Sequence, residues 1–283
     1  MSGKIKLYGF TGSNSVYTGR LMLEHKGLEY DFVKLPPAVH APTMLMLGFP
    51  TMGVPAMKVD GMRVQGTRWI ARALDELYPD KPLLFPADPE LRRKVQDAER
   101  WGEDLQNAVR RIFYCAARRD RKTFLSVLGS GRGPVKSLGM RMLAPVVIKL
   151  ATGLHRASDE AGREDIELVP QRMDQIDAWI ADGILGGEHL NAADYQIAVN
   201  VAALLLSEDL TPFIEWRPAA ALARRVLPEY GGHIGPVVPD EWMARLRAVD
   251  AGELVDRPSA GAAPPLTPGS DAVRFATIMR SNL

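Results

Sequence analysis

The chain has 283 residues, with 35 Lys and Arg against 34 Asp and Glu, a formal net charge of +1 at pH 7 and 46% hydrophobic residues. This length predicts one or two domains with a full core, and the composition excludes wholesale disorder, a collagen-like repeat and a disulfide scaffold. The balanced charge argues against nucleic acid as the main partner.

The single cysteine, Cys115, and an N-terminus without a long apolar stretch predict a reducing, cytoplasmic compartment. No run of about 18 apolar residues occurs, so we expect no membrane-spanning helix and no membrane partner. The five histidines lie far apart and lack metal-ligand spacing, so we expect no metal site.

The N-terminal part changes period several times along the chain. Alternating and branched residues predict strands, Asp60-Gly61 predicts a tight hairpin, and i, i+3, i+4 spacing predicts helices. The expected elements are a strand at 4–8, a helix closed by Gly27, a strand at 30–35, an irregular link, two strands at 56–59 and 62–64, and a helix from Thr67 that Tyr78-Pro79 stops.

A proline-rich connector and then a helical region follow. We expect an N-terminal domain at 1–79, a linker at 80–89, an all-helical domain at 90–250 and an extended or disordered tail at 251–283. Helices are predicted at 90–119, 137–155, 171–181, 192–206, 218–226 and 241–249. The glycine-rich piece 129–133 lacks the lysine and following helix of a phosphate-binding loop, so it is expected to be a flexible loop or lid.

Four motifs occur in an order that resembles the cytosolic glutathione transferases. They are LYGFTGSNS at 7–15, FPTMGVPAMKVDG at 49–61, VQGTRWI at 64–70 and LNAADYQIA at 190–198. The resemblance covers roughly residues 4 to 230 and implies an α+β fold. In that fold a thioredoxin-like βαβ-ββα N-terminal domain, which binds the thiol, precedes an all-α domain.

The first motif resembles the serine-containing zeta and theta classes, in which a serine at the place of Ser13 activates the thiol of glutathione. A hydroxyl donor near the positive end of a helix can supply the roughly 2 kcal/mol that half-ionises a thiol at neutral pH. The plain alternative is that Ser13 and Ser15 only cap the helix. We place Ser13 and Ser15 as catalytic candidates, and the alignment puts Gly9, not Tyr8, where other classes carry a catalytic tyrosine.

The second and third motifs correspond to the parts that hold glutathione in the family. There the Val-Pro bond is cis, which implies that Val54 and Pro55 align the backbone of the thiol peptide. Thr67 keeps a hydroxyl at a helix start that suits a carboxylate, or it is a plain helix cap. Gly66 replaces the usual acidic residue or glutamine, so the ammonium partner is absent. Asn14 and Arg68 complete the expected thiol-binding set.

The fourth motif is structural, because Asn191 and Asp194 can form a capping box before a buried helix. The family's second-substrate pocket implies roles for Phe10 and for one of three residues that share a helix face by i, i+4, i+7 spacing: Asn107, Arg111 and Tyr114. The alternative for these three is a solvated or packed face. The basic run at 110–122 either attracts an acidic substrate or nucleic acid or is a solvated helix end.

The resemblance implies a dimeric, detoxifying glutathione S-transferase. It would join glutathione or another low-molecular-weight thiol to a small apolar electrophile, or isomerise a double bond, with no metal. Because the thiol comes from the ligand, Cys115 is expected to be a bystander. The alternative functions are a non-catalytic thiol- or ligand-binding module of the same fold and a transferase that uses a thiol other than glutathione.

Overall fold

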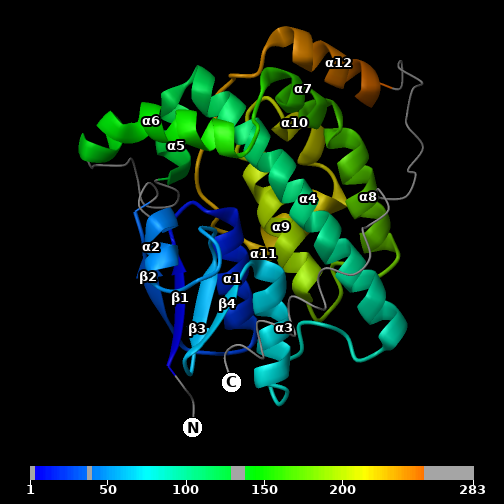
Figure 1. The fold of residues 1–283 in the computed structure, drawn as a ribbon. Coiled ribbons are helices and arrows are strands. Elements are labelled where there is room, and N and C mark those ends of the chain that lie inside the picture. Colours follow the sequence, from blue (N-terminus) through cyan, green and yellow to red (C-terminus); the bar gives the residue numbers. More distant parts are fainter. Residues whose placement is uncertain (1–3, 37–39, 129–137, 252–283) are drawn as a thin grey trace. The chain divides into compact units, whose positions relative to one another are not determined.

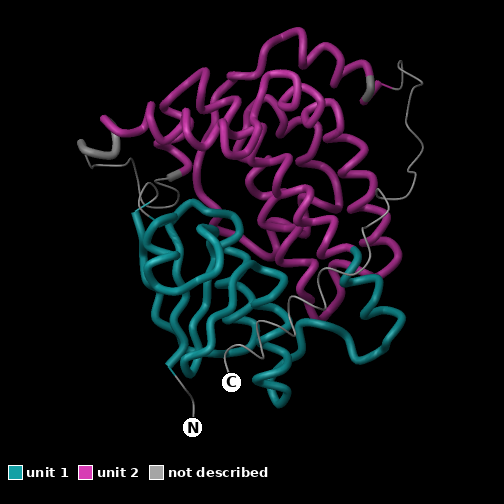
Figure 2. The backbone as a smooth tube through the Cα atoms, viewed as in Figure 1, with its two compact units in different colours: residues 1–97, 262–283 teal, residues 98–261 magenta. Residues whose placement is uncertain are grey.

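The computed structural model describes residues 4–36, 40–128 and 138–251. It contains a four-stranded sheet and a series of helices (Figure 1). The described residues divide into two compact units, with unit 1 extending to Asp97 and unit 2 beginning at Ala98 (Figure 2). The predicted tail at 251–283 lies outside the described residues except for Ala251, and so does the glycine-rich piece at 129–133.

Unit 1 carries the sheet, and its strand order is β2-β1-β3-β4. Strand β1 pairs in parallel with β2, and β3 pairs antiparallel with both β1 and β4. The elements in chain order are β1 (Ile5–Gly9), α1 (Asn14–His25), β2 (Tyr30–Lys34), α2 (His40–Met46), β3 (Ala56–Val59), β4 (Met62–Gln65) and α3 (Thr67–Leu77). This is the predicted thioredoxin-like order, and the fold class is confirmed.

Side-chain alternation along β1 separates the two faces of the sheet. Leu7 lies under α1 and packs closely against Gly19, where a Cβ atom would be 3.6 Å from the Leu7 side chain. Tyr8 points the opposite way and packs in a cluster with Met44 of α2 and Phe49, whose ring meets the Tyr8 ring edge-on at 5.5 Å. Tyr8 is therefore a core residue, in agreement with its exclusion from the catalytic candidates.

Helix α1 ends as the sequence predicts. Gly27 has φ +62°, its N–H donates to the Glu24 carbonyl, and the Leu28 N–H donates to the Leu23 carbonyl. These two bonds form a Schellman motif, in which glycine at the left-handed position avoids the strain that a Cβ would bring.

A buried ion pair ties α1 to α3 and to the chain that follows α3. The Lys26 ammonium lies 2.7 Å from the Asp75 carboxylate, and the two side chains are only 0% and 7% exposed. Lys26 also donates to the Tyr78 carbonyl, while the Asp75 oxygens accept from the N–H groups of Leu84 and Phe85. The buried charges are thus paired with each other and hydrogen-bonded to the backbone, as burial requires.

Unit 2 is built from helices, as predicted. They are α4 (Pro89–Arg119, whose first turns lie in unit 1), α5 (Arg121–Leu128), α6 (Leu138–Leu154), α7 (Asp159–Glu167), α8 (Val169–Ala181), α9 (Ala192–Leu204), α10 (Thr211–Ile214), α11 (Pro218–Val226) and α12 (Asp240–Asp250). Helix α9 is buried along nearly its whole length and packs against α11 (Figure 1).

The capping box at the start of α9 is confirmed. The Asn191 side chain accepts from the N–H groups of Ala193 and Asp194, and the Asp194 carboxylate accepts from the N–H groups of Asn191 and Gly186. Burial raises the pKa of Asp194 to about 6, and the backbone donors oppose that rise.

Four helices differ from the sequence prediction. Helix α2 occupies part of the predicted irregular link. Pro42 is compatible with this helix because it falls in the first turn, where a missing N–H costs little. Helices α5 and α7 follow acidic or hydroxyl caps, with Asp120 accepting from the Lys122 N–H and Ser158 from the Ala161 N–H. The fourth, α10, is a single short turn. Among the described helices, none combines the length and apolar character needed to cross a bilayer.

Removal of one partner of the buried pair should destabilise unit 1 strongly. We expect Lys26→Met to lower the free energy of unfolding by about 3–5 kcal/mol, because Asp75 keeps a buried charge without its cation. Urea unfolding followed by circular dichroism measures the change. The matched control is Lys4→Met, which breaks the exposed Lys4–Asp31 pair of 3.0 Å and should cost at most about 1 kcal/mol. Equal losses in the two variants would contradict the role assigned to burial.

Candidate functional site

The register of the sheet brings three chain segments to one edge. Ala56, the first residue of β3, pairs with Tyr8 near the end of β1 and with Gln65 at the end of β4. The loop after β1, the loop before β3 and the turn after β4 therefore meet there. These segments carry the predicted thiol-binding residues of unit 1.

The segment before β3 has the backbone geometry that the resemblance implies. The Val54–Pro55 peptide bond is cis, Pro55 is buried and Val54 is half-buried. The Pro55 carbonyl accepts from the Gly66 N–H at 2.9 Å, which attaches this loop to the start of α3. A side chain at Gly19 would contact the Pro55 ring at 3.5 Å, so α1 packs closely beneath it.

Two serines form a chain of hydrogen bonds at the start of α1. The buried Ser15 hydroxyl donates to the Val54 carbonyl at 3.0 Å, and the Ser13 and Ser15 hydroxyl oxygens lie 3.1 Å apart. A hydroxyl has one proton, so when Ser15 directs its proton to the Val54 carbonyl, Ser13 is the donor between the two serines. Ser13 is the N-cap residue of α1 by backbone position, yet its side chain makes no capping hydrogen bond.

This arrangement distinguishes the two candidates. Ser13 is half-buried, and its single proton can be redirected to a stronger acceptor. Ser15 is 3% exposed and connects α1 to the loop before β3. The geometry thus fits Ser13 for contact with a ligand and Ser15 for a positioning role, and the alternative that both serines only cap the helix does not describe their side chains.

Gln65 is a contributor that the sequence analysis did not single out. Its amide nitrogen donates to the carbonyls of Thr51 and Gly53 at 2.8 and 2.6 Å, and its oxygen accepts from the Thr51 N–H at 3.0 Å. Gln65 therefore fixes the loop that leads to Val54. The sequence feature that could have indicated this role is a polar residue at the end of a predicted strand, directly before the glycine that replaces the family's acidic residue or glutamine.

The start of α3 supplies the rest of the edge. Gly66 is the N-cap at φ +93°, a conformation that strains any residue with a side chain. Thr67 is buried in the first turn, and Arg68 follows it half-buried, with its carbonyl accepting from the Arg72 guanidinium at 2.8 Å. Glycine, which has no side chain, thus suits the backbone conformation at position 66.

Two helix N-termini, those of α1 and α3, lie at this edge. Neither helix has an acidic residue in its first turn, so their positive ends are not neutralised from within. Such an arrangement favours an anionic ligand. Asn14 is half-buried at the first position of α1, and the Phe10 ring lies 4.9 Å from that of His40.

The three candidates on α4 belong to unit 2 and have separate surroundings. Asn107 is exposed, and its side-chain oxygen accepts from the Arg110 guanidinium at 3.2 Å. Arg111 forms a two-pronged salt bridge with the buried Asp165, at 2.6 and 2.9 Å, which also raises the pKa of Arg111. These contacts favour the packed alternative for Arg111, because its guanidinium already has a partner.

Tyr114 stacks on His155, with ring centroids 5.3 Å apart and an interplanar angle of 8°. Burial raises the pKa of Tyr114, and the positive charge of Arg110 opposes that rise. Burial lowers the pKa of His155 to about 4, and Arg110 acts in the same direction. This stack holds a neutral imidazole against the phenol ring, a pairing that the sequence spacing did not reveal.

Cys115 agrees with its expected bystander role. It is 2% exposed, its sulfur lies 3.3 Å from the Ser158 carbonyl, and burial raises the pKa of the thiol. A reactive cysteine has the opposite character, with a lowered pKa and access to solvent. In the described part of the chain, no group of three or more His, Cys, Asp or Glu side chains could hold a metal ion.

The segments at the sheet edge match those of a known family. Residues 7–82 match the glutathione S-transferase N-terminal domain. The match covers less than half of the chain and falls within unit 1. Among curated proteins, none matches the chain.

Solved structures resemble the chain over most of its length. A rice glutathione transferase, GST1, in complex with glutathione is 13% identical, with a TM-score of 0.55 over 89% of this chain and 99% of that one. The β-etherase LigF from Sphingobium sp. strain SYK-6 is 19% identical, with a TM-score of 0.54 over 78% and 99%.

A glutathione S-transferase from Methylobacterium radiotolerans in complex with glutathione sulfonate is 18% identical, with a TM-score of 0.51 over 83% of this chain and 98% of that one. At these identities the three structures establish the fold: the chain has the two-part architecture of glutathione transferases.

The buried His155 should make stability depend on pH. Its pKa is about 4 in the folded chain and about 6.5 when unfolded, so the unfolded state takes up a proton first as the pH falls from 6.5 toward 4. Folding stability is lost in that window. Allowing for the partial exposure of the ring, we expect His155→Phe to remove about 1–2 kcal/mol of this loss while keeping the stack on Tyr114.

Urea unfolding of both chains at pH 7 and pH 4.5 measures the difference, and other titrating groups contribute equally to both. The control is His189→Phe at an exposed histidine, which should keep the wild-type pH dependence. If His155→Phe loses as much stability on acidification as the wild type, the assignment is wrong.

Proposed function

We propose that the protein is a glutathione transferase-like enzyme with Ser13 as the residue that stabilises the thiolate. It would transfer a low-molecular-weight thiol to a small, electrophilic and largely apolar substrate, or use the thiol to isomerise a double bond. The hydrogen-bond chain from Ser13 through Ser15 to the Val54 carbonyl carries this proposal. It joins a hydroxyl donor to the loop that the resemblance assigns to the thiol peptide.

Ser13 would act by donating its hydrogen bond to the sulfur of the ligand instead of to Ser15. A hydrogen bond to a charged group contributes about 1.5–3 kcal/mol, against about 1 kcal/mol for a neutral one, so the exchange favours the thiolate. The difference of about 0.5–2 kcal/mol lowers the thiol pKa by about 0.4–1.5 units. A thiol whose ordinary pKa is about 8.5 would then be up to about half ionised near pH 7, against a few per cent without the bond.

The remaining edge residues would hold the rest of the thiol peptide. The Val54 carbonyl keeps a second lone pair beside the Ser15 bond, so it could also accept an N–H from the ligand. Thr67 and the start of α3 offer an anion site for a carboxylate. Asn14 and Arg68 border this place, and Phe10 would face the second substrate.

In the chemical step the thiolate sulfur attacks an electrophilic carbon. The thiol proton goes to solvent, the sulfur–carbon bond forms, and the leaving group departs with its electron pair. In isomerisation the sulfur adds and later departs, which regenerates the thiol. Asn107 and Tyr114 remain candidates for orienting the electrophile, whereas Arg111 would first have to leave Asp165.

Glutathione is the proposed thiol, because two of the similar structures hold glutathione or its sulfonate. Gly66 motivates the two alternatives, since the usual ammonium partner is missing there. One is a transferase that uses another thiol, and the other is a thiol- or ligand-binding module without catalysis.

We further propose a cytoplasmic homodimer with a role in detoxification. Four large apolar side chains on α2 and the loop after it support self-association: Leu45, Met46, Leu47 and Met52 are 38–86% exposed. Size-exclusion chromatography with light scattering measures the oligomeric state.

The test compares Ser13→Ala with Ser15→Ala. We expect Ser13→Ala to raise the pKa of the bound thiol by about 0.4–1.5 units and to lower kcat/KM for conjugation to a chromogenic electrophile about tenfold or more. Ser15→Ala should mainly weaken thiol binding, because it frees the loop before Val54. Ultraviolet absorbance of the thiolate gives the pKa, and calorimetry with glutathione gives the Kd.

Three outcomes distinguish the proposed enzyme from the two alternative functions. Binding of glutathione with no conjugation would favour the binding module. Binding and turnover with a different thiol alone would favour the second alternative. An unchanged thiol pKa in Ser13→Ala, with turnover intact, would remove Ser13 from the mechanism.

A further inference from the structure

Helix α6 carries a stripe of exposed apolar side chains, which we call the α6 stripe. Its members are Met142 (73% exposed), Leu143 (50%), Val146 (55%), Leu150 (70%) and Leu154 (80%). Four of them follow i, i+4 spacing, so they lie along one face of the helix. The opposite face is packed, with Ala144 and Ile148 buried in a cluster with Ala117 and Phe124. A contiguous exposed apolar surface of this kind marks a contact with another molecule.

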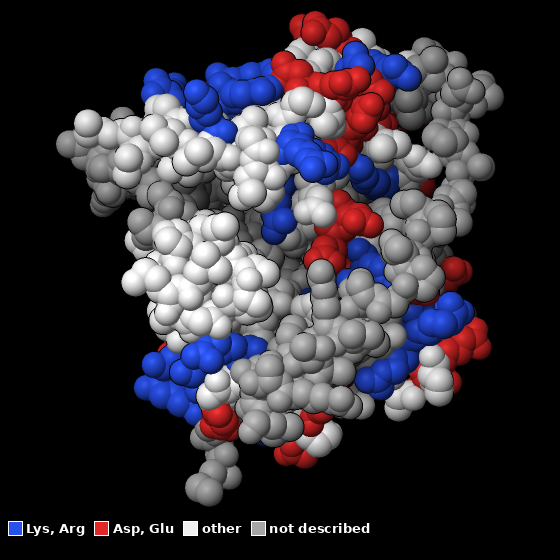
Figure 3. Space-filling view, viewed as in Figure 1, with Lys and Arg blue, Asp and Glu red and all other residues white. Residues whose placement is uncertain are grey.

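The same part of the chain is strongly basic. Among the side chains that the structure describes at 118–127 and 142–156 are six Lys and Arg and one Asp, and two of the six, Arg118 and Arg119, pair with Asp159. Arg121, Lys122, Lys149 and Arg156 are exposed, and no acidic side chain in the described structure forms an ion pair with them. Figure 3 shows basic side chains gathered over the α5–α6 region beside uncharged surface.

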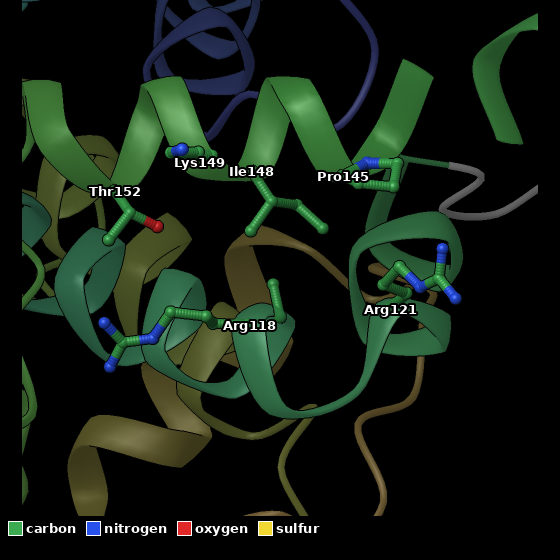
Figure 4. A pocket seen from close by; sticks show the side chains of 7 residues that line it. Arg118, Arg121, Pro145, Ile148, Lys149 and Thr152 are labelled. Atoms are coloured by element: carbon green, nitrogen blue, oxygen red, sulfur yellow. The ribbon is translucent and has the colours of Figure 1, made fainter. Parts of the chain in front are cut away.

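A pocket of about 430 Å³ lies next to the α6 stripe, between α6 and the junction of α4 and α5 (Figure 4). Its lining combines an apolar floor with a cationic rim: Ala117, Arg118, Arg121, Pro145, Ile148, Lys149 and Thr152. The buried Thr152 hydroxyl oxygen has no hydrogen-bond partner among the described residues. Arg118 pairs with Asp159, which leaves Arg121 and Lys149 as the rim cations without an acidic partner.

These observations favour a bilayer over other occupants of this surface. A second copy docking through the same surface would bring two strongly positive segments together, which costs free energy. A nucleic acid would match the charge but would leave five apolar side chains against phosphates and water. An anionic membrane interface matches both features, because it offers acyl chains beneath a layer of negative head groups.

We propose that the exposed faces of helices α5 and α6 dock the protein on a membrane surface that contains anionic phospholipid. The α6 stripe enters the boundary between head groups and acyl chains, and Arg121 and Lys149 meet lipid phosphates at the rim of the pocket. The sequence expectation of no membrane partner rested on the lack of a spanning helix, and a helix that lies in the interface needs no span. The proposal does not depend on the thiol chemistry.

Flotation of the full chain with lipid vesicles tests the proposal. We expect binding to vesicles of phosphatidylcholine with phosphatidylserine, much weaker binding to phosphatidylcholine alone, and a decrease as salt screens the charges. Leu150→Gln/Leu154→Gln should reduce partitioning at least tenfold, because the apolar contact is lost. The matched control is Leu77→Gln/Leu83→Gln at exposed leucines of unit 1, which should bind like the wild type.

The charge contribution has its own pair of variants. Arg121→Gln/Lys149→Gln should reduce partitioning about 30-fold, from about fivefold for each basic residue near an anionic surface. The control Lys34→Gln/Arg247→Gln removes one exposed lysine and one exposed arginine outside the segment and should have little effect. Circular dichroism should give the same melting temperature for every variant whose changed side chains are exposed.

Several results would overturn the proposal. Equal binding to both vesicle types, or none to either, excludes an anionic surface as the partner. A dimer that Leu150→Gln/Leu154→Gln dissociates would assign the α6 stripe to a second copy. Duplex DNA binding that Arg121→Gln/Lys149→Gln abolishes, without vesicle binding, would assign the charge to nucleic acid.

Discussion

The pairing of Ala56 between Tyr8 and Gln65 is the constraint on which the candidate site depends. Because β3 lies between β1 and β4 in this register, the ends of β1 and β4 and the start of β3 share one edge. A slip by one residue would turn every side chain of β3 to the other face of the sheet. It would also carry Val54 away from Ser15 and separate Gln65 from the loop that it holds.

The polar groups that unit 1 buries have two different tasks. Lys26 and Asp75 balance each other and hold the chain after α3. Ser15 and Thr67 are buried at the edge itself and carry no charge. The half-buried Arg68 and the positive ends of α1 and α3 therefore favour an anionic ligand at this edge.

The sequence predicted the order of strands and helices in unit 1 because each change of period coincides with a turn signal. Asp60-Gly61 and Gly27 were sufficient to place the hairpin and the end of α1. Helices α5 and α7 were missed because a basic run and a loop-like composition hid the Asp120 and Ser158 caps. The role of Gln65 and the salt bridge between Arg111 and Asp165 depend on partners distant in sequence, which no local pattern identifies.

The backbone at Gly66 limits how recognition at this edge could change. With φ at +93°, this position resists every L-residue that has a side chain, so a carboxylate introduced there would bring backbone strain with it. A chain with this turn can gain a partner for an ammonium group without that strain only through a neighbouring position, or through a different turn after β4. Under the proposed function, selectivity among thiols would then depend on backbone conformation as well as on residue type.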